Sequence, residues 1–335
     1  MKQTRITVIP GDGIGPSIVE AALQILDKAG CNFAYDYADA GLTALEKHGE
    51  LLPQQTLDLI KNNQITLKGP LTTPVGSGFT SINVTLRKTF DLYANLRPVI
   101  SFEGTQARYQ DIDIITVREN TQGMYSGLGQ KLSHDGNSAE AMSVITREGA
   151  ERIVTFAFEL ARREKRKKVT IVHKANIMKS TSGLFLDVAR EIAKKYSDIQ
   201  SEEMIVDATC MNLVMYPEKF DVIVTTNLFG DIVSDLCAGL VGGLGMAPGA
   251  NIGKDIAIFE AVHGSAPDIA GQNIANPSSV ILASIQMLEY LGMHEPAQKI
   301  VKALTETIAT ADRTTRDLGG SHNTTDFTQA ILDRL

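Results

Sequence analysis

Two aspartates that follow a short apolar run are the residues in this sequence best placed for chemistry. Asp231 and Asp235 come behind the β-branched run 222–224, after Asn227 and Gly230, where the pattern becomes helical. Residues four apart share one helix face, so both carboxylates can converge on a hard cation such as Mg²⁺ or Mn²⁺. Open α/β sheets bind ligands where a strand ends before a helix. The alternative is structural, with Asp231 capping the helix and Asp235 simply solvated.

Three arginines and two short polar residues could bind a polycarboxylate. Ser81 and Asn83 precede Arg87, and Arg97 and Arg118 follow, the last at the end of a predicted strand. A guanidinium group matches a carboxylate with two parallel hydrogen bonds. A structural ion pair is the alternative reading of either Arg87 or Arg97 alone.

Three further residues could act beside such a substrate. Tyr125 lies in a glycine-rich loop and could present its hydroxyl group. Lys174 follows the predicted strand 169–172; it is either a solvated charge or, beside a metal-bound substrate, a proton acceptor with a lowered pKa. Asp207 ends another strand-like segment and is a third candidate carboxylate.

The glycine-rich segment 10–16 resembles a dinucleotide-binding loop only in part. A G-x-G-x-x-G fingerprint needs a glycine where this chain has Pro16, and no acidic residue ends a strand about 20 residues later. Pro16 suits the first turn of a helix. We therefore expect a loop that starts a helix and binds no phosphate.

Composition excludes several classes of protein. The 335 residues, 43% of them hydrophobic and 21% charged, predict a soluble chain of two lobes. A formal net charge of −7 argues against nucleic-acid and membrane partners, and the basic run 162–168 is predicted to be a solvated helix end. Cys31, Cys210 and Cys237 form no C-x-x-C pair, so neither a zinc site nor a disulfide framework is predicted. Without an apolar leader or a run of about 18 apolar residues, a cytoplasmic protein is expected.

Periodicity predicts the elements that position these residues. Apolar runs predict strands over 6–9, 112–117, 169–172 and 256–259, and helical spacing predicts a helix over 148–163. The segment 128–145 alternates weakly around the turn signal 135–137, which predicts a hairpin arm that reaches a partner subunit. The small-residue segment 238–246 predicts a return to the first lobe.

Together these motifs resemble the β-decarboxylating dehydrogenases, the family of isocitrate, 3-isopropylmalate and homoisocitrate dehydrogenases. The resemblance covers the whole chain and rests on 11–16, 86–88, 95–98, 118–120, Tyr125, Lys174, 263–267 and above all 227–245. It is strongest to the short NAD-dependent isocitrate dehydrogenases, through 89–98 and 173–178. The implied fold is α/β, with two lobes that share a mixed sheet of ten or more strands. A discontinuous large, nucleotide-binding domain would comprise 1–97 and 241–335, and 98–240 would form a small domain with the dimer clasp and the metal aspartates.

The resemblance also implies a substrate and cofactors. Isopropylmalate enzymes carry acidic and leucine-type residues where this chain has Ser81 and Asn83, whose hydrogen-bonding groups suit the third carboxylate of isocitrate. NADP-dependent relatives carry a lysine and a tyrosine near Asp268 and Ile269, whereas an aspartate would hold the ribose hydroxyls of NAD and repel a 2′-phosphate. The implied substrate-binding residues are Thr73, Ser81, Asn83, Arg87, Arg97, Arg118 and Asn176; the ligands of Mg²⁺ or Mn²⁺ are Asp207, Asp231 and Asp235; and the cofactor-binding residues are Glu260, His263, Gly264, Ser265, Ala266, Asp268, Ile269 and Asn276.

By the same resemblance the protein is a homodimer, or a higher homo-oligomer, with shared active sites. The partner subunit's Lys174 would accept the substrate hydroxyl proton, the partner subunit's Asp207 would complete the metal site, and Tyr125 would supply a proton at C3 after CO₂ leaves. Two alternatives stay open: a homoisocitrate or 3-isopropylmalate dehydrogenase, and a non-catalytic regulatory subunit of a hetero-oligomeric isocitrate dehydrogenase. The presence of Tyr125 and Lys174 argues against the second.

Overall fold

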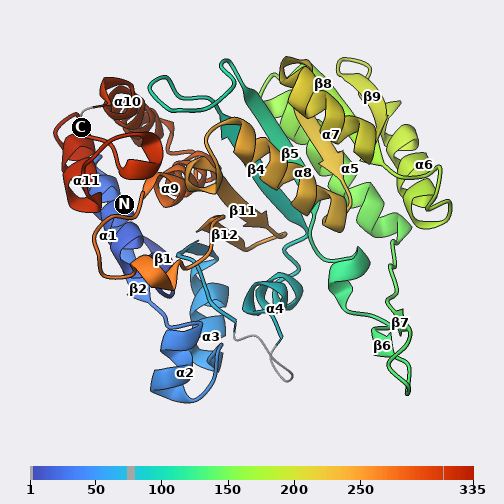
Figure 1. The fold of residues 1–335 in the computed structure, drawn as a ribbon, viewed down its shortest axis with the longest axis horizontal. Helices are drawn as coiled ribbons and strands as arrows, with labels where there is room; N and C mark the ends of the chain where they lie inside the picture. The colour runs from blue at the N-terminus through green and yellow to red at the C-terminus, as the bar shows by residue number, and fades with distance from the viewer. Residues whose placement is uncertain (1–2, 74–79, 312) are drawn as a thin grey trace.

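The computed structural model describes residues 3–73, 80–311 and 313–335, so the predicted loop over 70–78 lies partly outside the described residues. A ten-stranded sheet runs through the described part of the chain (Figure 1). In spatial order its strands are β2 (Phe33–Tyr37), β1 (Thr4–Ile9), β3 (Ile65–Lys68), β12 (Ala257–Ala261), β11 (Pro248–Ile252), β4 (Ala94–Ile100), β5 (Asp113–Glu119), β10 (Val222–Thr225), β8 (Lys168–His173) and β9 (Gln200–Ile205).

The sheet consists of two parallel halves joined by an antiparallel centre. Strands β2, β1, β3 and β12 pair in parallel, and so do β5, β10, β8 and β9. Between them, β11 and β4 pair antiparallel with each other and with their outer neighbours. The predicted α/β class with a mixed sheet is confirmed.

Helices cover both halves of the sheet (Figure 1). They are α1 (Gly15–Lys28), α2 (Leu42–His48), α3 (Gln54–Asn63), α4 (Ile82–Thr89), α5 (Arg147–Arg163), α6 (Thr181–Ala193), α7 (Val206–Met215), α8 (Asn227–Leu240), α9 (Ser278–Tyr290), α10 (His294–Thr310) and α11 (Thr324–Leu332), with short 3₁₀ turns η1 (Gly123–Ser126), η2 (Pro217–Lys219), η3 (Leu244–Met246), η4 (Pro267–Ile269) and η5 (Arg316–Leu318). Helices α1, α9, α10 and α11 pack together beside β12 and β3, whereas α5 and α6 cover β8 and β10, and α8 lies on β5 with α7 beside it. In the described part of the chain, no helix combines the length and the apolar character needed to cross a bilayer.

Two predicted boundaries are wrong, both next to candidate site residues. Helix α8 begins at Asn227 rather than after Gly230, since the backbone is extended only as far as Thr226. Asp231 therefore lies in the second turn of α8 and does not cap the helix. Strand β9 ends at Ile205, and Asp207 lies in the first turn of α7 rather than at a strand end. The predicted hairpin arm is confirmed as β6 (Lys131–Leu132) paired with β7 (Ala139–Glu140), which projects from the body in Figure 1.

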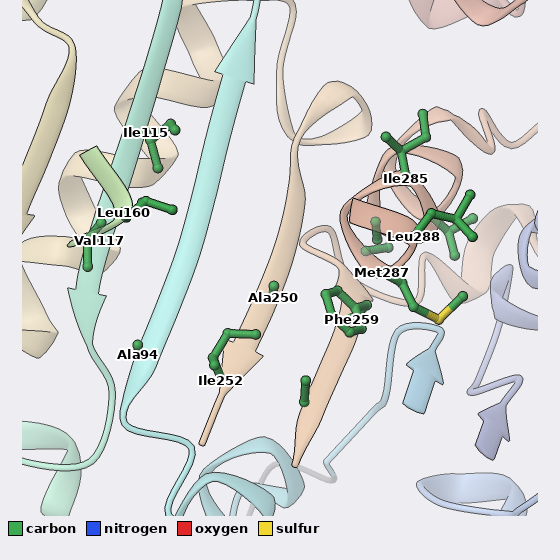
Figure 2. Close-up of a cluster of buried hydrophobic side chains, with 14 of the residues drawn as sticks. Ala94, Ile115, Val117, Leu160, Ala250, Ile252, Phe259, Ile285, Met287 and Leu288 are labelled. Carbon is green, nitrogen blue, oxygen red and sulfur yellow. The ribbon is translucent and has the colours of Figure 1, made fainter. Parts of the chain in front are cut away.

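The larger of two apolar clusters at the centre of the sheet joins its two halves. Figure 2 draws its members from β4, β5, β11, β12, α5 and α9: Ala94, Ile115, Val117, Ala250, Ile252, Phe259, Leu160, Ile285, Met287 and Leu288. These side chains come from both predicted domains, so one core joins them. The division at residues 97/98 and 240/241 stays a prediction.

Candidate active site

One face of the sheet carries a belt of buried polar side chains. Residues that lie opposite each other on neighbouring strands point to the same face. The register places Lys68 opposite Glu260, Asn251 opposite Asn95, and Asn95 opposite Arg118. All of these side chains are buried. The belt therefore brings polar side chains from five strands to one face of the sheet, which α8 covers over β4 and β5.

Arg118 anchors α8 to this face. Its Nε and Nη2 donate to Asn227 Oδ1 at 3.2 and 2.8 Å, and its Nη1 forms an ion pair with Asp231. Gly230 makes the contact possible, because its backbone lies against the Arg118 side chain. Helix α8 thus presents Asp231 directly to a buried guanidinium group.

The other two predicted arginines converge on the same place. Arg97 Nη1 lies 3.1 Å from Asp235 Oδ1, and its Nη2 lies 3.9 Å from Asp231 Oδ1. Arg87 projects from α4, and its Nη2 lies 3.9 Å from Glu260 Oε1. Burial, and next the nearby Arg87, lowers the pKa of Arg118 to about 10. Crowded, poorly solvated cations of this kind favour a ligand with several negative charges.

Tyr125, on η1, brings a phenol hydroxyl to this cluster. Its hydroxyl donates to Asp231 Oδ2, and its ring lies 5.0 Å from the Arg118 guanidinium carbon. Burial, followed by the hydrogen bond to Asp231, raises the pKa of Tyr125. The phenol therefore keeps its proton at neutral pH and can donate it.

The aspartates fit a divalent cation only in part. Asp231 and Asp235 offer hard oxygen donors on one helix face, as predicted. Among the described residues, however, no group of three His, Cys, Asp or Glu side chains could hold a metal ion. Asp207 is instead exposed and 2.5 Å from Lys174 Nζ. A single chain therefore holds two of the three predicted ligands together.

The remaining predicted substrate residues lie around α4 and after β8. Ser81 is the N-cap of α4, with its Oγ 3.5 Å from the backbone N of Val84, and Thr73 Oγ1 accepts from the backbone N of Ile82 at 3.3 Å. Asn83 and Arg87, four residues apart, line one small internal cavity with Glu260. Asn176 lies exposed in the loop that follows β8.

A pocket of about 490 Å³ is the candidate nucleotide site. Its walls include the predicted residues His263, Gly264, Ala266, Ile269 and Asn276. The buried His263 Nε2 has no hydrogen-bond partner among the described residues, and Asn276 Nδ2 donates to Asp317 Oδ2 at 2.9 Å. Mostly apolar walls with few polar groups suit an aromatic base.

The other three predicted cofactor residues lie apart from the walls of this pocket. Asp268 is exposed on η4, between Ala266 and Ile269. Ser265 is buried, and its carbonyl accepts from the backbone N of Ile14 at 2.9 Å. Glu260 is buried beside Lys68, at 2.7 Å. The glycine-rich segment 10–16 thus packs against Ser265, and its Ile14 lines the pocket.

Sequence reasoning missed several residues of the site. They include Lys68, Asn95 and Asn251; of these, Asn251 is the single polar residue of an apolar strand, a signal that could have found it. Arg316 and Asp317 line the nucleotide pocket but carry no signal, because only the fold brings η5 to it.

The chain is similar to known proteins over nearly its whole length. A family model described as Isocitrate/isopropylmalate dehydrogenase matches residues 5–331. The mitochondrial NAD isocitrate dehydrogenase catalytic subunit 5 of Arabidopsis thaliana is 47% identical over 98% of this chain and 88% of that relative. A 3-isopropylmalate dehydrogenase of Archaeoglobus fulgidus is 50% identical over 99% of both chains. The crystal structure of isocitrate dehydrogenase from Methylococcus capsulatus, 54% identical, superimposes with a TM-score of 0.96 and covers 99% of both chains.

Proposed function

Because the chain belongs to the isocitrate/isopropylmalate dehydrogenase family, whose members are oxidative decarboxylating dehydrogenases, we propose that it converts isocitrate to 2-oxoglutarate and CO₂ with NAD and Mg²⁺ or Mn²⁺. The observation that carries the choice of substrate is the polar face of α4. Asn83 and Arg87, four residues apart, share that face. An alkyl group packed against this face would leave polar atoms unpaired, whereas a third carboxylate would accept hydrogen bonds from it.

The chain's own residues supply binding and proton transfer. Arg87, Arg97 and Arg118 would hold the carboxylates. Tyr125 would supply the proton at C3 after CO₂ leaves. The partner subunit's Lys174 would accept the hydroxyl proton. When bound, the divalent cation supplies Lewis acidity and NAD takes up the two electrons.

A second copy of the chain is the proposed partner. Helices α7 and α8 leave large apolar side chains exposed beside Asp207 and the metal aspartates, among them Met211, Met215 and Ile232. Leu132 of the hairpin arm is also exposed. Apolar surface of this kind is typical of an interface. Its burial in a homodimer would bring Lys174 and Asp207 of one subunit to the aspartates of the other.

A 3-isopropylmalate dehydrogenase is the second candidate, because the Archaeoglobus relative is as similar as the isocitrate dehydrogenases. Homoisocitrate, one methylene longer than isocitrate, is a further substrate to be tested. Initial rates of the purified chain with the three acids, each with NAD and with NADP, separate these functions. We expect isocitrate with NAD to give the highest kcat/KM. A higher value with isopropylmalate or with NADP would contradict the proposal, and no activity with any pair would favour a regulatory subunit.

A further inference from the structure

The buried amide of Asn251 is hydrogen-bonded on both sides within the polar belt. Its Oδ1 accepts from Asn95 Nδ2 at 3.0 Å and from Asn120 Nδ2 at 2.9 Å, and its Nδ2 donates to Glu260 Oε1 at 2.7 Å. All four residues are buried, with Asn251 only 3% exposed. This amide therefore lies at the centre of a buried hydrogen-bond network.

The network joins two parts of the site by hydrogen bonds. On one side, Glu260 Oε2 pairs with Lys68 at 2.7 Å, and its Oε1 lies 3.9 Å from Arg87. On the other side, Asn95 Oδ1 accepts from Arg97 Nε at 3.0 Å, and Arg97 in turn pairs with Asp235. Asn251 is the link between them.

The hydrogen-bonding chemistry of the end groups dictates how each amide is turned. The Glu260 carboxylate only accepts, so Asn251 must direct its NH₂ toward it and its oxygen toward Asn95. Asn95 then donates to Asn251, which leaves its oxygen for Arg97, and a guanidinium group only donates. Turning either amide over would place donor against donor or acceptor against acceptor in a buried site, which is costly.

We propose that Asn251 is a positioning residue that orients Arg97 and Glu260 as one unit, so that Arg97 and Arg87, which lies beside Glu260, hold a fixed relative geometry. Asn251 does not touch the substrate in this role. The identity of the acid that is bound rests on the proposed function, whereas the geometry does not. The proposal implies that loss of Asn251 weakens binding of the acid, whereas binding of NADH in the pocket that Glu260 does not line stays unchanged.

The test replaces the amide with a carboxylate, Asn251→Asp. The introduced group faces Glu260, with Lys68, Arg87 and Arg97 as the nearby cations. Two carboxylates that share a buried site raise the pKa of one, so at about pH 6 a shared proton restores a donor to Glu260, whereas at about pH 8.5 the two repel. Relative to wild type, we expect KM for the acid to rise at least about tenfold at the higher pH and to recover at the lower one, with Kd for NADH unchanged. The variant Asn251→Leu should show no recovery.

The matched control is Asn63→Asp, at an amide that donates to Asp36 Oδ2 at 2.9 Å, beside β1 and β2 at the far edge of the sheet. We expect its KM and Kd to equal those of wild type. The proposal is overturned if the Asn251 variants lower only Tm and the amount of active enzyme, with KM for the acid unchanged, or if Asn251→Asp follows the pH profile of wild type. Should Asn251→Leu fail to fold, Asn251→Ser takes its place.

Rates are measured with whichever acid the wild-type enzyme uses best, and NADH binding is titrated by fluorescence. If that acid is not isocitrate, the proposed substrate is wrong while the Asn251 test still stands. If isocitrate is the best substrate and the Asn251 variants bind normally, only the inference about Asn251 fails.

Discussion

Arg118 and Gly230 lie closer together than any side chain at position 230 would permit. A Cβ atom on Gly230 would lie 2.4 Å from Arg118 Cγ and 2.7 Å from Arg118 Cβ. The missing side chain lets α8 approach β5, and this approach places Asp231 against the guanidinium group. One atom at position 230 therefore decides whether the candidate metal ligand Asp231 and the candidate substrate residue Arg118 can form their ion pair.

We expect Gly230→Ala to lower kcat/KM by on the order of 10- to 100-fold, because Arg118 or α8 must shift. The control lies on the same helix: a Cβ on Gly239 would meet nothing within 4 Å. Gly239→Ala should keep full activity. The measurements are kcat/KM and Tm of both variants. Normal activity of Gly230→Ala would show that the close contact between Gly230 and Arg118 is not needed for activity.

The shared-site hypothesis predicts that two inactive variants complement each other. Asp207→Asn and Asp231→Asn each disable every site of their own homodimer. A mixed dimer would carry both changes at one site and none at the other, so random mixing should restore roughly a quarter of wild-type activity. Activity after co-expression or after unfolding and refolding together is the measurement.

The control for complementation combines Asp231→Asn with Asp235→Asn. Both residues lie on α8 of the same chain, so every site in a mixed dimer keeps one change and no activity should return. Recovery in this control, or none in the Asp207 and Asp231 mixture, would exclude a metal site shared across the dimer.

Asp268 should govern the choice between NAD and NADP. It is exposed on η4, next to two residues of the nucleotide pocket. Replacing it with serine removes a negative charge that would repel a 2′-phosphate, so kcat/KM for NADP should rise roughly tenfold, about 1.4 kcal/mol. Asp255→Ser, at an exposed position between β11 and β12, is the control. An unchanged ratio of NADP to NAD activity in Asp268→Ser would remove this residue from the cofactor site.

His263 should make the nucleotide-free protein less stable in mild acid. Burial lowers the pKa of His263 below its ordinary value of 6.5. As the pH falls below 6.5, the unfolded chain takes up a proton here that the folded chain does not, so stability is lost by at most about 1.4 kcal/mol per pH unit. Urea unfolding between about pH 7 and pH 5 should show a shallower decline for His263→Gln than for wild type. His134→Gln, at an exposed imidazole, controls for loss of the ring.

Most of the fold and the charged part of the site were predictable from local patterns. The helix over 148–163 and the buried strands have strong periodicity, and both were found within a few residues. The start of α8 was missed because Asn227 and Gly230 look like strand breakers, although the first supports Arg118 and the second gives it room. Tertiary contact overrode local propensity there.

The sequence by itself determined which residues are candidates for the chemistry, because the reactivity of carboxylates, guanidinium groups and a phenol follows from residue type and their spacing indicates a shared site. Only the tertiary structure decided which of them meet. The register between β4, β11 and β12 places Asn95, Asn251 and Glu260 on one face, and no one-dimensional pattern encodes a pairing between residues 156 positions apart. The tertiary structure also places Asp207 beside Lys174 and Asp231 beside Arg118, although both aspartates were predicted as ligands of one metal ion.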